Sequence, residues 1–291
     1  MNIAILSRGE SLYSTKSLYN AGAARAHSVK VLDPSYCSLS IEIGQPIVYY
    51  QGDKIDNLHA IIPRIGSSNT LYGANVVRHF EAMGVFTVAR SEGIINSRDK
   101  WTCFQMLVKH NIPVPRTLYT SYFNFEEQLE TFGDRPVIIK LLEGTHGEGV
   151  ILTESRRNAL ATIETLNAAG VKFLLQEYIE ESKGADIRVI VVDDIVVASM
   201  KRQCKEGDFR SNLHRGGSSE KIELSASEEN IAIKAAKAMG LGFCGVDILQ
   251  SKNGPLVLEI NSTPGLEGIE NTSGRNISKS VIGYIERHAK K

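Results

Sequence analysis

Two segments near the C-terminus decide the fold: Gly245-Val-Asp-Ile-Leu249 and Leu256-Val-Leu-Glu-Ile-Asn-Ser-Thr-Pro-Gly265. In both segments apolar residues flank every polar one, which is the pattern of β-strands with one buried face. Side chains alternate across a strand, so Glu259 and Asn261 point to the same face. The two segments therefore predict a β-hairpin that gathers polar side chains on one surface.

The loop between these strands decides whether Asp247 joins Glu259 on that surface. A three-residue loop, 252–254, pairs the two carboxylates directly, whereas a two-residue turn at 253–254 places them on opposite faces. We favour the three-residue loop. Two carboxylates and the amide of Asn261 then lie together, and such hard oxygen donors suit Mg²⁺ or Mn²⁺ with phosphates. The alternative is a polar face that is merely solvated.

A lysine lies inside the otherwise apolar strand predicted at 137–142. Lys140 needs a partner there, because an unpaired buried ammonium is costly. The glycines at 144, 147 and 149 let backbone N–H groups approach phosphate oxygens closely. Neither the Gly-Lys-Ser/Thr of a Walker loop nor the G-x-G-x-x-G of a dinucleotide fold is present. The segment predicts a phosphate-binding loop, with a surface hairpin carrying an incidental lysine as the alternative.

Further polar residues lie at strand ends and in a basic stretch. Glu177 and Tyr178 end one strand, and Asp186 and Arg188 begin the next, so backbone groups and a carboxylate are available to an adenine and a ribose. The stretch 201–217 holds five Lys/Arg against two Asp/Glu, an excess of three positive charges in a chain of zero net charge. Such a run is usually a solvated face, but its Arg, Asn and Ser side chains also suit phosphate and carboxylate oxygens.

The remaining pattern divides the 291 residues into three predicted units. Residues 1–96 alternate short apolar strands with helices, as in an α/β domain with a parallel sheet. Residues 97–185 begin with a helix for which Ser97 is a plausible N-cap, followed by an α+β pattern. Residues 186–291 contain β-branched strands joined at Asp193-Asp194, and a helix opened by the capping box of Ser225 and Glu228.

Composition narrows the functional classes. Lys plus Arg (33) balances Asp plus Glu (33), which argues against general nucleic-acid binding. The four cysteines are widely spaced, without a C-x-x-C pair, and suggest reduced thiols in a cytoplasmic protein. The first apolar run is too short for a signal peptide or a membrane span, so neither secretion nor a membrane anchor is expected.

Taken together, the order of these features closely resembles the ATP-grasp superfamily. Within it, the segments 207–217 and 259–267 resemble the RimK branch, the ribosomal protein S six glutamate ligases. Ile3 to Arg8, Ile62 to Gly66 and Ser97 to Lys100 also fit that branch, so the resemblance covers nearly the whole chain. It implies an α/β and α+β ATP-grasp fold, with an N-terminal Rossmann-like pre-grasp domain and ATP held between two α+β subdomains.

The resemblance also implies a role for each matching position. The residues that would bind ATP are Lys100, Lys140, Glu177, Tyr178, Asp186, Arg210, Ser211 and Asn212. Arg210 and Asn212 would also act on the reacting acyl group. Asp247, Glu259 and Asn261 would hold two Mg²⁺ or Mn²⁺ ions. Candidate partners for the carboxylates of glutamate are Arg188, Arg202, His214 and Arg215.

The implied activity is ATP-dependent α-L-glutamate ligation. Glutamate would be added through an acyl phosphate to the C-terminal carboxylate of a protein or peptide, with ribosomal protein S six as the expected acceptor; the resemblance also allows a homo-oligomer. One alternative is a sibling glutamyl ligase that acts on a small molecule and shares every motif. The other is a non-catalytic ATP-binding interaction module of the synapsin type, which has less need for the set formed by Asp247, Glu259 and Asn261.

Overall fold

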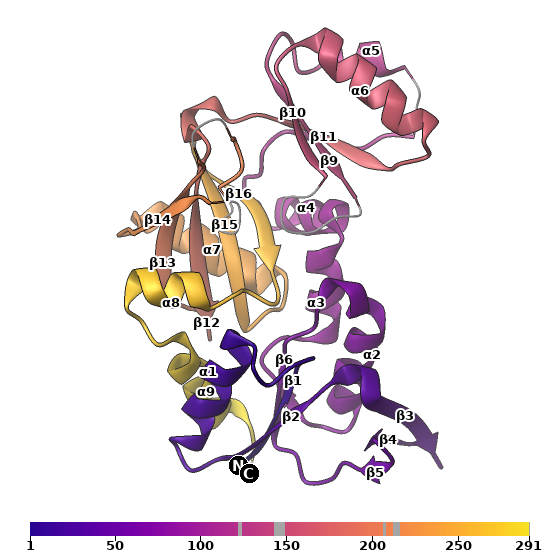
Figure 1. Ribbon diagram of the computed structural model, residues 1–291, viewed down its shortest axis with the longest axis vertical. Coiled ribbons are helices and arrows are strands. Elements are labelled where there is room, and N and C mark those ends of the chain that lie inside the picture. Colours follow the sequence, from indigo (N-terminus) through magenta and orange to yellow (C-terminus); the bar gives the residue numbers. More distant parts are fainter. Residues whose placement is uncertain (122–123, 143–148, 206–207, 212–215, 291) are drawn as a thin grey trace.

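The computed structural model describes residues 1–291 except 122–123, 143–148, 206–207, 212–215 and 291. Its layers follow one another along the longest axis of the molecule (Figure 1). A parallel sheet lies at the end that holds both termini, a large antiparallel sheet lies in the middle, and a smaller antiparallel sheet with two helices lies at the other end. Among the described residues, no helix has both the length and the apolar character that crossing a membrane requires.

The N-terminal sheet is parallel, with strand order β2-β1-β6-β7. Its strands and helices are β1 (Asn2–Leu6), α1 (Tyr13–Ala23), β2 (Ser28–Leu32), β6 (Ala60–Pro63), α2 (Thr70–Ala82) and β7 (Phe86–Thr87). The predicted alternation of strands and helices is confirmed. Because β1 and β6 run in parallel, the residues that follow them emerge at the same edge of the sheet, which faces the middle of the molecule (Figure 1).

A small antiparallel sheet between β2 and β6 was not predicted from the sequence. It has the order β3-β4-β5, with β3 (Cys37–Glu42), β4 (Gln45–Tyr50) and β5 (Asp53–Lys54). The segment 37–42 does alternate apolar and polar residues, as a strand would, but the first turn places Ile43 and Gly44 at positive φ, 50° and 77°. A β-branched residue is uncommon at such a position, so the sequence gives no turn signal there.

The predicted helix start at Ser97 is wrong. Ser97 lies inside α3 (Ser91–Arg98), and a separate helix, α4 (Lys100–Lys109), follows after a single residue. That residue, Asp99, is the N-cap of α4, and its side chain accepts a hydrogen bond from the backbone N–H of Thr102 at 2.8 Å. A carboxylate is as good a cap as a hydroxyl, and here it serves a helix two residues later than the expected one.

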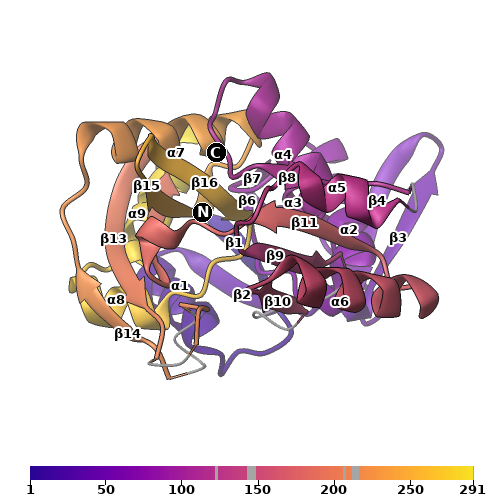
Figure 2. The same cartoon turned by 90° about the horizontal axis from the view of Figure 1, so that it is seen from above.

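The antiparallel sheet farthest from the termini has the order β10-β9-β11-β8. Its elements are β8 (Thr117–Leu118), α5 (Phe125–Glu130), β9 (Val137–Leu141), β10 (Val150–Thr153), α6 (Arg156–Ala168) and β11 (Phe173–Glu177). Both helices cover one face of this sheet (Figure 2), and their shared core includes Leu129, Ile139 and Ile163. This is the α+β pattern expected for the segment.

The middle sheet is antiparallel, with strand order β14-β13-β12-β15-β16. Its elements are β12 (Ala185–Val192), β13 (Ile195–Gln203), β14 (Ser218–Lys221), α7 (Ala226–Ala238), β15 (Phe243–Ser251), β16 (Gly254–Asn261), α8 (Glu267–Ser273) and α9 (Ile277–His288). Asp193 and Asp194 form the β12–β13 turn at φ 52° and 61°, and the capping box of Ser225 and Glu228 opens α7, both as predicted.

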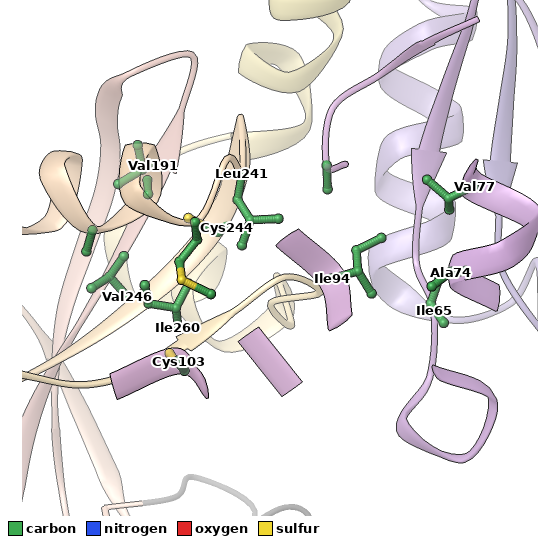
Figure 3. Packing of buried hydrophobic residues seen from close by; sticks show 14 of the residues in the cluster. Ile65, Ala74, Val77, Ile94, Cys103, Val191, Leu241, Cys244, Val246 and Ile260 are labelled. Carbon is green, nitrogen blue, oxygen red and sulfur yellow. The ribbon is translucent and has the colours of Figure 1, made fainter. Parts of the chain in front are cut away.

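One hydrophobic cluster joins the parallel sheet to the middle sheet (Figure 3). It runs from Ile65 and Val77, through Ile94 of α3, to Val246 of β15 and Ile260 of β16. All five side chains are at most 3% exposed. Buried apolar contact of this kind is the main source of cohesion in a folded chain. The edge of the parallel sheet is therefore held in a fixed place beside the end of β16.

Gly93 provides a test of this junction. A Cβ added there would lie 2.5 Å from the carbonyl oxygen of Met239 and 2.8 Å from Leu241, so α3 could not keep its distance from the middle sheet. We expect Gly93→Ala to lower the free energy of unfolding by about 1–3 kcal/mol in urea denaturation, as overpacking does. Gly283→Ala is the matched control, since only the flexible end of Arg287 approaches that helical position. Equal stability of the two variants would contradict this packing.

Candidate active site

Polar side chains form a row across one face of the middle sheet. Asp186 and Arg188 lie two residues apart on β12 and so share a face. Their cross-strand partners are Arg202 on β13, which pairs with Asp186, and Asp247 on β15, which pairs with Arg188. Four charged groups of alternating sign therefore lie side by side in the interior of the sheet.

Asp247 is the most heavily engaged carboxylate of the row. It is 2% exposed, and it accepts hydrogen bonds from Arg188 Nε at 2.8 Å, Arg188 Nη2 at 2.6 Å and Arg202 Nη2 at 2.9 Å. Burial alone would raise the pKa of Asp247, but the two guanidinium groups hold it well below the usual range. Asp247 is therefore a carboxylate that stays charged although it is buried.

Asp186 is held by the same arginine from the other side. Arg202 Nε donates to Asp186 Oδ1 at 2.7 Å, and the hydroxyl of Ser211 donates to Asp186 Oδ2 at 2.7 Å. All three residues are buried. Burial opposes the charge of Arg202, yet Asp247 and Asp186 raise its pKa above the ordinary value. The sequence predicts that Asp186 binds ribose and Ser211 binds phosphate, and in the structure these two side chains form a hydrogen bond with each other.

The β15–β16 hairpin pairs Asp247 with Glu259, as predicted, but by a different geometry. Ser251 pairs with Gly254, so the turn holds only two residues, Lys252 and Asn253. The register then shifts by one residue between Asp247 and Ile248. A β-bulge of this kind adds one residue to one strand and restores the face that the shorter turn would have lost. The conclusion about the shared face is thus confirmed, and the three-residue loop is wrong.

Glu259 and Asn261 extend the row to the edge strand. Asn261 Nδ2 donates to Glu259 Oε1 at 2.9 Å and lies 3.4 Å from Asp247 Oδ2. Glu259 is the more open carboxylate, with 52% of its side chain exposed, and it lies 4.0 Å from Arg188 Nη2. One buried carboxylate, one exposed carboxylate and one amide therefore meet at the solvent side of β15 and β16.

Two lysines face this group from other elements. Lys140 of β9 lies where burial lowers its pKa to about 8, an effect that Glu259 and Asp247 oppose and that Lys100 adds to. Burial also lowers the pKa of Lys100 at the start of α4, and its ammonium donates to the carbonyl oxygen of Leu142 at 3.1 Å. Lysines from two different elements thus lie near the carboxylates of β15 and β16, separated along the chain by more than 100 residues.

Other predicted site residues have partners within the protein. The Glu177 carboxylate accepts a hydrogen bond from the backbone N–H of Arg116 at 2.7 Å. The backbone N–H of Tyr178 donates to the carbonyl oxygen of Pro136 at 3.3 Å. Arg210 is paired with Asp208, whose pKa lies well below its usual range chiefly because of that hydrogen bond. Asn212, His214 and Arg215, and the glycines at 144 and 147, lie outside the described residues.

The donor set at the end of the hairpin fits a hard divalent cation. Asp247, Glu259 and Asn261 offer carboxylate and amide oxygens from adjacent strands, which is the chemistry that Mg²⁺ and Mn²⁺ prefer. In the described structure Asp247 is already balanced by two arginines, whereas Glu259 carries most of the exposed negative charge. Glu259 is therefore the oxygen donor of this set that a cation could reach most easily.

Comparison with known proteins places the chain in a family. The pattern of the RimK PreATP-grasp domain matches residues 1–94, and that of the RimK-like ATP-grasp domain matches residues 97–285. The chain belongs to the RimK family of ATP-grasp ligases. Relatives in this family include a protein named "Probable alpha-L-glutamate ligase" from Vibrio parahaemolyticus serotype O3:K6, 49% identical over 100% of this chain and 97% of the relative. Another of the same name, from Shewanella loihica, is 50% identical over the same shares.

Solved structures confirm the ATP-grasp fold of this RimK family member. The ATP-grasp ligase PsnB, complexed with its minimal precursor, superposes with a TM-score of 0.78 at 23% identity, covering 98% of each chain. D-alanine–D-alanine ligase from Bacillus anthracis superposes with a TM-score of 0.66 at 16% identity, covering 99% of this chain and 96% of the other. The resemblance seen in the motifs therefore extends to the whole fold.

The row of alternating charges predicts that Arg202 contributes far more to the free energy of unfolding than its neighbour Lys201. Arg202→Met would leave Asp186 and Asp247 buried without their shared cation, and we expect it to lower the free energy of unfolding by about 3–5 kcal/mol. Lys201→Met is the matched control. Lys201 is paired only loosely with Glu220, at 3.9 Å, so its loss should change stability by less than about 0.5 kcal/mol. Urea denaturation of both variants measures the difference.

Proposed function

We propose that this RimK family member is an ATP-dependent α-L-glutamate ligase. It would add glutamate to the C-terminal carboxylate of a protein or peptide, with ribosomal protein S six as the expected acceptor. The proposal rests on the name of relatives about half identical over the full length, and on one structural observation. In the structure, Lys100 and Lys140 lie near the carboxylate and amide oxygens of β15 and β16. This arrangement suits a polyphosphate bound together with a cation.

In this proposal ATP lies between the β8–β11 sheet and the middle sheet. Lys100, Lys140 and Arg210 would contact its phosphates, together with Ser211 and Asn212, while Glu177, Tyr178 and Asp186 would contact adenine and ribose. Asp247, Glu259 and Asn261 would hold two Mg²⁺ or Mn²⁺ ions, which would neutralise phosphate charge when bound. A solved structure of PsnB contains Mg and ADP, which supports the choice of nucleotide and metal.

The chemistry follows from the poor reactivity of a carboxylate. An acceptor carboxylate oxygen attacks the γ-phosphorus of ATP, the bond to the β-phosphate oxygen breaks, and ADP leaves. The amine of glutamate then attacks the acyl carbon, phosphate departs, the amide forms, and the amine releases a proton. Lys140 and Arg210 would offset the charge that gathers on the transferring phosphoryl group, and the protein's main task is to position the reactants.

Two of the proposed glutamate partners are already paired within the fold. Arg188 and Arg202 already donate from Nε and Nη2 to Asp247 and Asp186, so glutamate would compete with those hydrogen bonds. His214 and Arg215, on a segment outside the described residues, remain candidates. Any further residue that binds a substrate carboxylate would lie outside the basic stretch 201–217.

The rival functions differ in what they consume. A sibling ligase would join glutamate to a small molecule, and a non-catalytic ATP-binding module would consume nothing. Incubation with ATP, Mg²⁺ and glutamate, followed by mass spectrometry of ribosomal protein S six and of small-molecule acceptors, distinguishes these. Mass increments of whole glutamate residues on the protein support the proposal, whereas a product formed only on a small molecule overturns it.

Three further proposals concern the domain boundaries, the oligomeric state and the location of the protein in the cell. The division at 96–97 and 185–186 would separate a pre-grasp domain, a central subdomain and a C-terminal subdomain. The family resemblance would allow a homo-oligomer. We also place the protein in the cytoplasm, where four unpaired cysteines such as these are ordinary.

Glu259→Gln tests the metal assignment. This change keeps the size of the side chain and removes the exposed charge beside Asp247, so we expect glutamate-dependent ADP release to fall at least about 100-fold while thermal stability is kept. Glu229→Gln, an exposed change on α7, is the control and should leave turnover unchanged. Turnover near that of the wild type in Glu259→Gln would remove Glu259 from the metal site.

The lowered pKa of Lys140 predicts how the affinity for ATP depends on pH. Its pKa of about 8 lies below that of an ordinary lysine, so the ammonium that would pair with phosphate is progressively lost above pH 8 in the free protein. ATP affinity should then fall by up to about tenfold for each further pH unit. Lys140→Arg keeps its charge throughout this range, and titration calorimetry from pH 7 to 9.5 should show a flatter profile for it. Parallel profiles would contradict the assignment.

A further inference from the structure

A second group of arginines lies at the edge where the parallel sheet meets the middle sheet. Arg64 directly follows β6, and Arg98 ends α3. Burial lowers the pKa of Arg64 to about 10, with Arg98 adding to the effect, and the pKa of Arg98 is also lowered by burial. A guanidinium group stays protonated at neutral pH, so both side chains are charged there. The described residues offer neither arginine a carboxylate partner.

The partners that these arginines do have are neutral. Arg64 Nη2 donates to the carbonyl oxygen of Pro264 at 2.7 Å. Arg98 donates to the carbonyl oxygen of Ile65 at 2.6 Å and to the hydroxyl of Thr70 at 2.9 Å. Two cations held near one another only by neutral groups repel, and a bound anion would relieve that repulsion.

Unsatisfied hydrogen-bonding groups belong to the residues that the Arg64–Pro264 hydrogen bond brings together. Among the described side chains, the buried polar atoms that lack a partner include Arg64 Nη1, Ser262 Oγ and Thr263 Oγ1. Ser262 and Thr263 directly precede Pro264, the residue that Arg64 holds, and Ser262 is 1% exposed. A buried polar group without a partner costs free energy, so three such groups on residues this closely connected need an explanation.

The position suits a substrate of the ligase. The carboxyl ends of parallel strands are the usual binding edge of an α/β sheet, and Arg64 emerges there. Thr263 is two residues beyond Asn261, a span of at most roughly 7 Å, so the group lies close to the proposed metal site. Guanidinium forks and hydroxyls bind carboxylates well, whereas the ATP phosphates are already assigned to Lys100 and Lys140.

We propose that Arg64, Arg98, Ser262 and Thr263 form a binding site for a substrate carboxylate. The carboxylate belongs either to the incoming glutamate or to the acceptor chain, and this inference rests on the ligase function proposed above. Unlike Arg188 and Arg202, the arginines of this site have no acidic partner among the described residues.

Thr263→Val and Thr153→Val form a matched pair of test variants. The Thr263 hydroxyl has no partner among the described residues, so its removal should not lower Tm, but it should raise the KM for glutamate or for the acceptor about tenfold. The buried Thr153 hydroxyl donates to the carbonyl oxygen of Val137 at 2.8 Å, far from this site. Thr153→Val should therefore lower Tm and leave both KM values unchanged. Arg64→Lys, which keeps the charge but not the fork, should raise the same KM as Thr263→Val, although the loss of its hydrogen bond to Pro264 is expected to lower Tm as well.

The assay uses L-glutamate and a synthetic peptide that ends in two glutamates, with the KM for ATP as an internal reference. A rise confined to glutamate or to the peptide supports the site and identifies which substrate supplies the carboxylate. Unchanged KM values for both substrates in Thr263→Val and Arg64→Lys overturn it, and the unpartnered atoms then hold only water.

A separate measurement keeps this inference distinct from the ligase proposal. If the wild-type protein shows no glutamate-dependent ADP release, the ligase proposal has failed, and the carboxylate site is tested by binding alone. Sodium glutarate should then raise the Tm of the wild type and not that of Thr263→Val or Arg64→Lys. An equal response in all three proteins overturns the site.

Discussion

The structure depends on the pairing of Arg202 with both Asp186 and Asp247. These residues occupy three neighbouring strands, so their contacts fix the register of β13, β12 and β15 from within the face that carries the site. Buried ion pairs often contribute little net stability, but removing one partner is costly. The charge row therefore acts mainly as a constraint on which residues meet. It sets Asp247 in place, and through the hairpin it sets Glu259 opposite.

The same pairing explains why carboxylates are available at β16 but arginines are not available at β12 and β13. A guanidinium that already donates to two buried oxygens gains little by leaving them for a solvated substrate. Substrate recognition is then expected where cations lack acidic partners. Arg64 and Arg98 meet that condition in the described part of the chain, and the cluster running from Ile65 to Ile260 holds them beside the end of β16.

Sequence reasoning worked where local rules determine the result. Alternation placed Glu259 and Asn261 on one face, and the Ser225–Glu228 capping box opened α7. Sequence reasoning gave the wrong turn at 252–253. A β-bulge and a change of loop length can compensate for one another, so two different turns can place Asp247 and Glu259 on the same face of the sheet. It also missed the sheet of β3 to β5, whose turn at Ile43 uses a backbone conformation that the residue type does not announce.

The arginines at the domain edge show a different limit. Arg64 follows an apolar strand and Arg98 ends a helix, and each position is ordinary for a solvated arginine in the sequence. Their significance comes only from partners that are missing in three dimensions, and a pattern along the chain cannot record a missing contact. The chain has zero net charge, so its ability to bind an anion depends on which basic side chains lack an acidic partner. The arginines of β12 and β13 are neutralised within the fold, whereas those at the domain edge keep their charge for a ligand to neutralise.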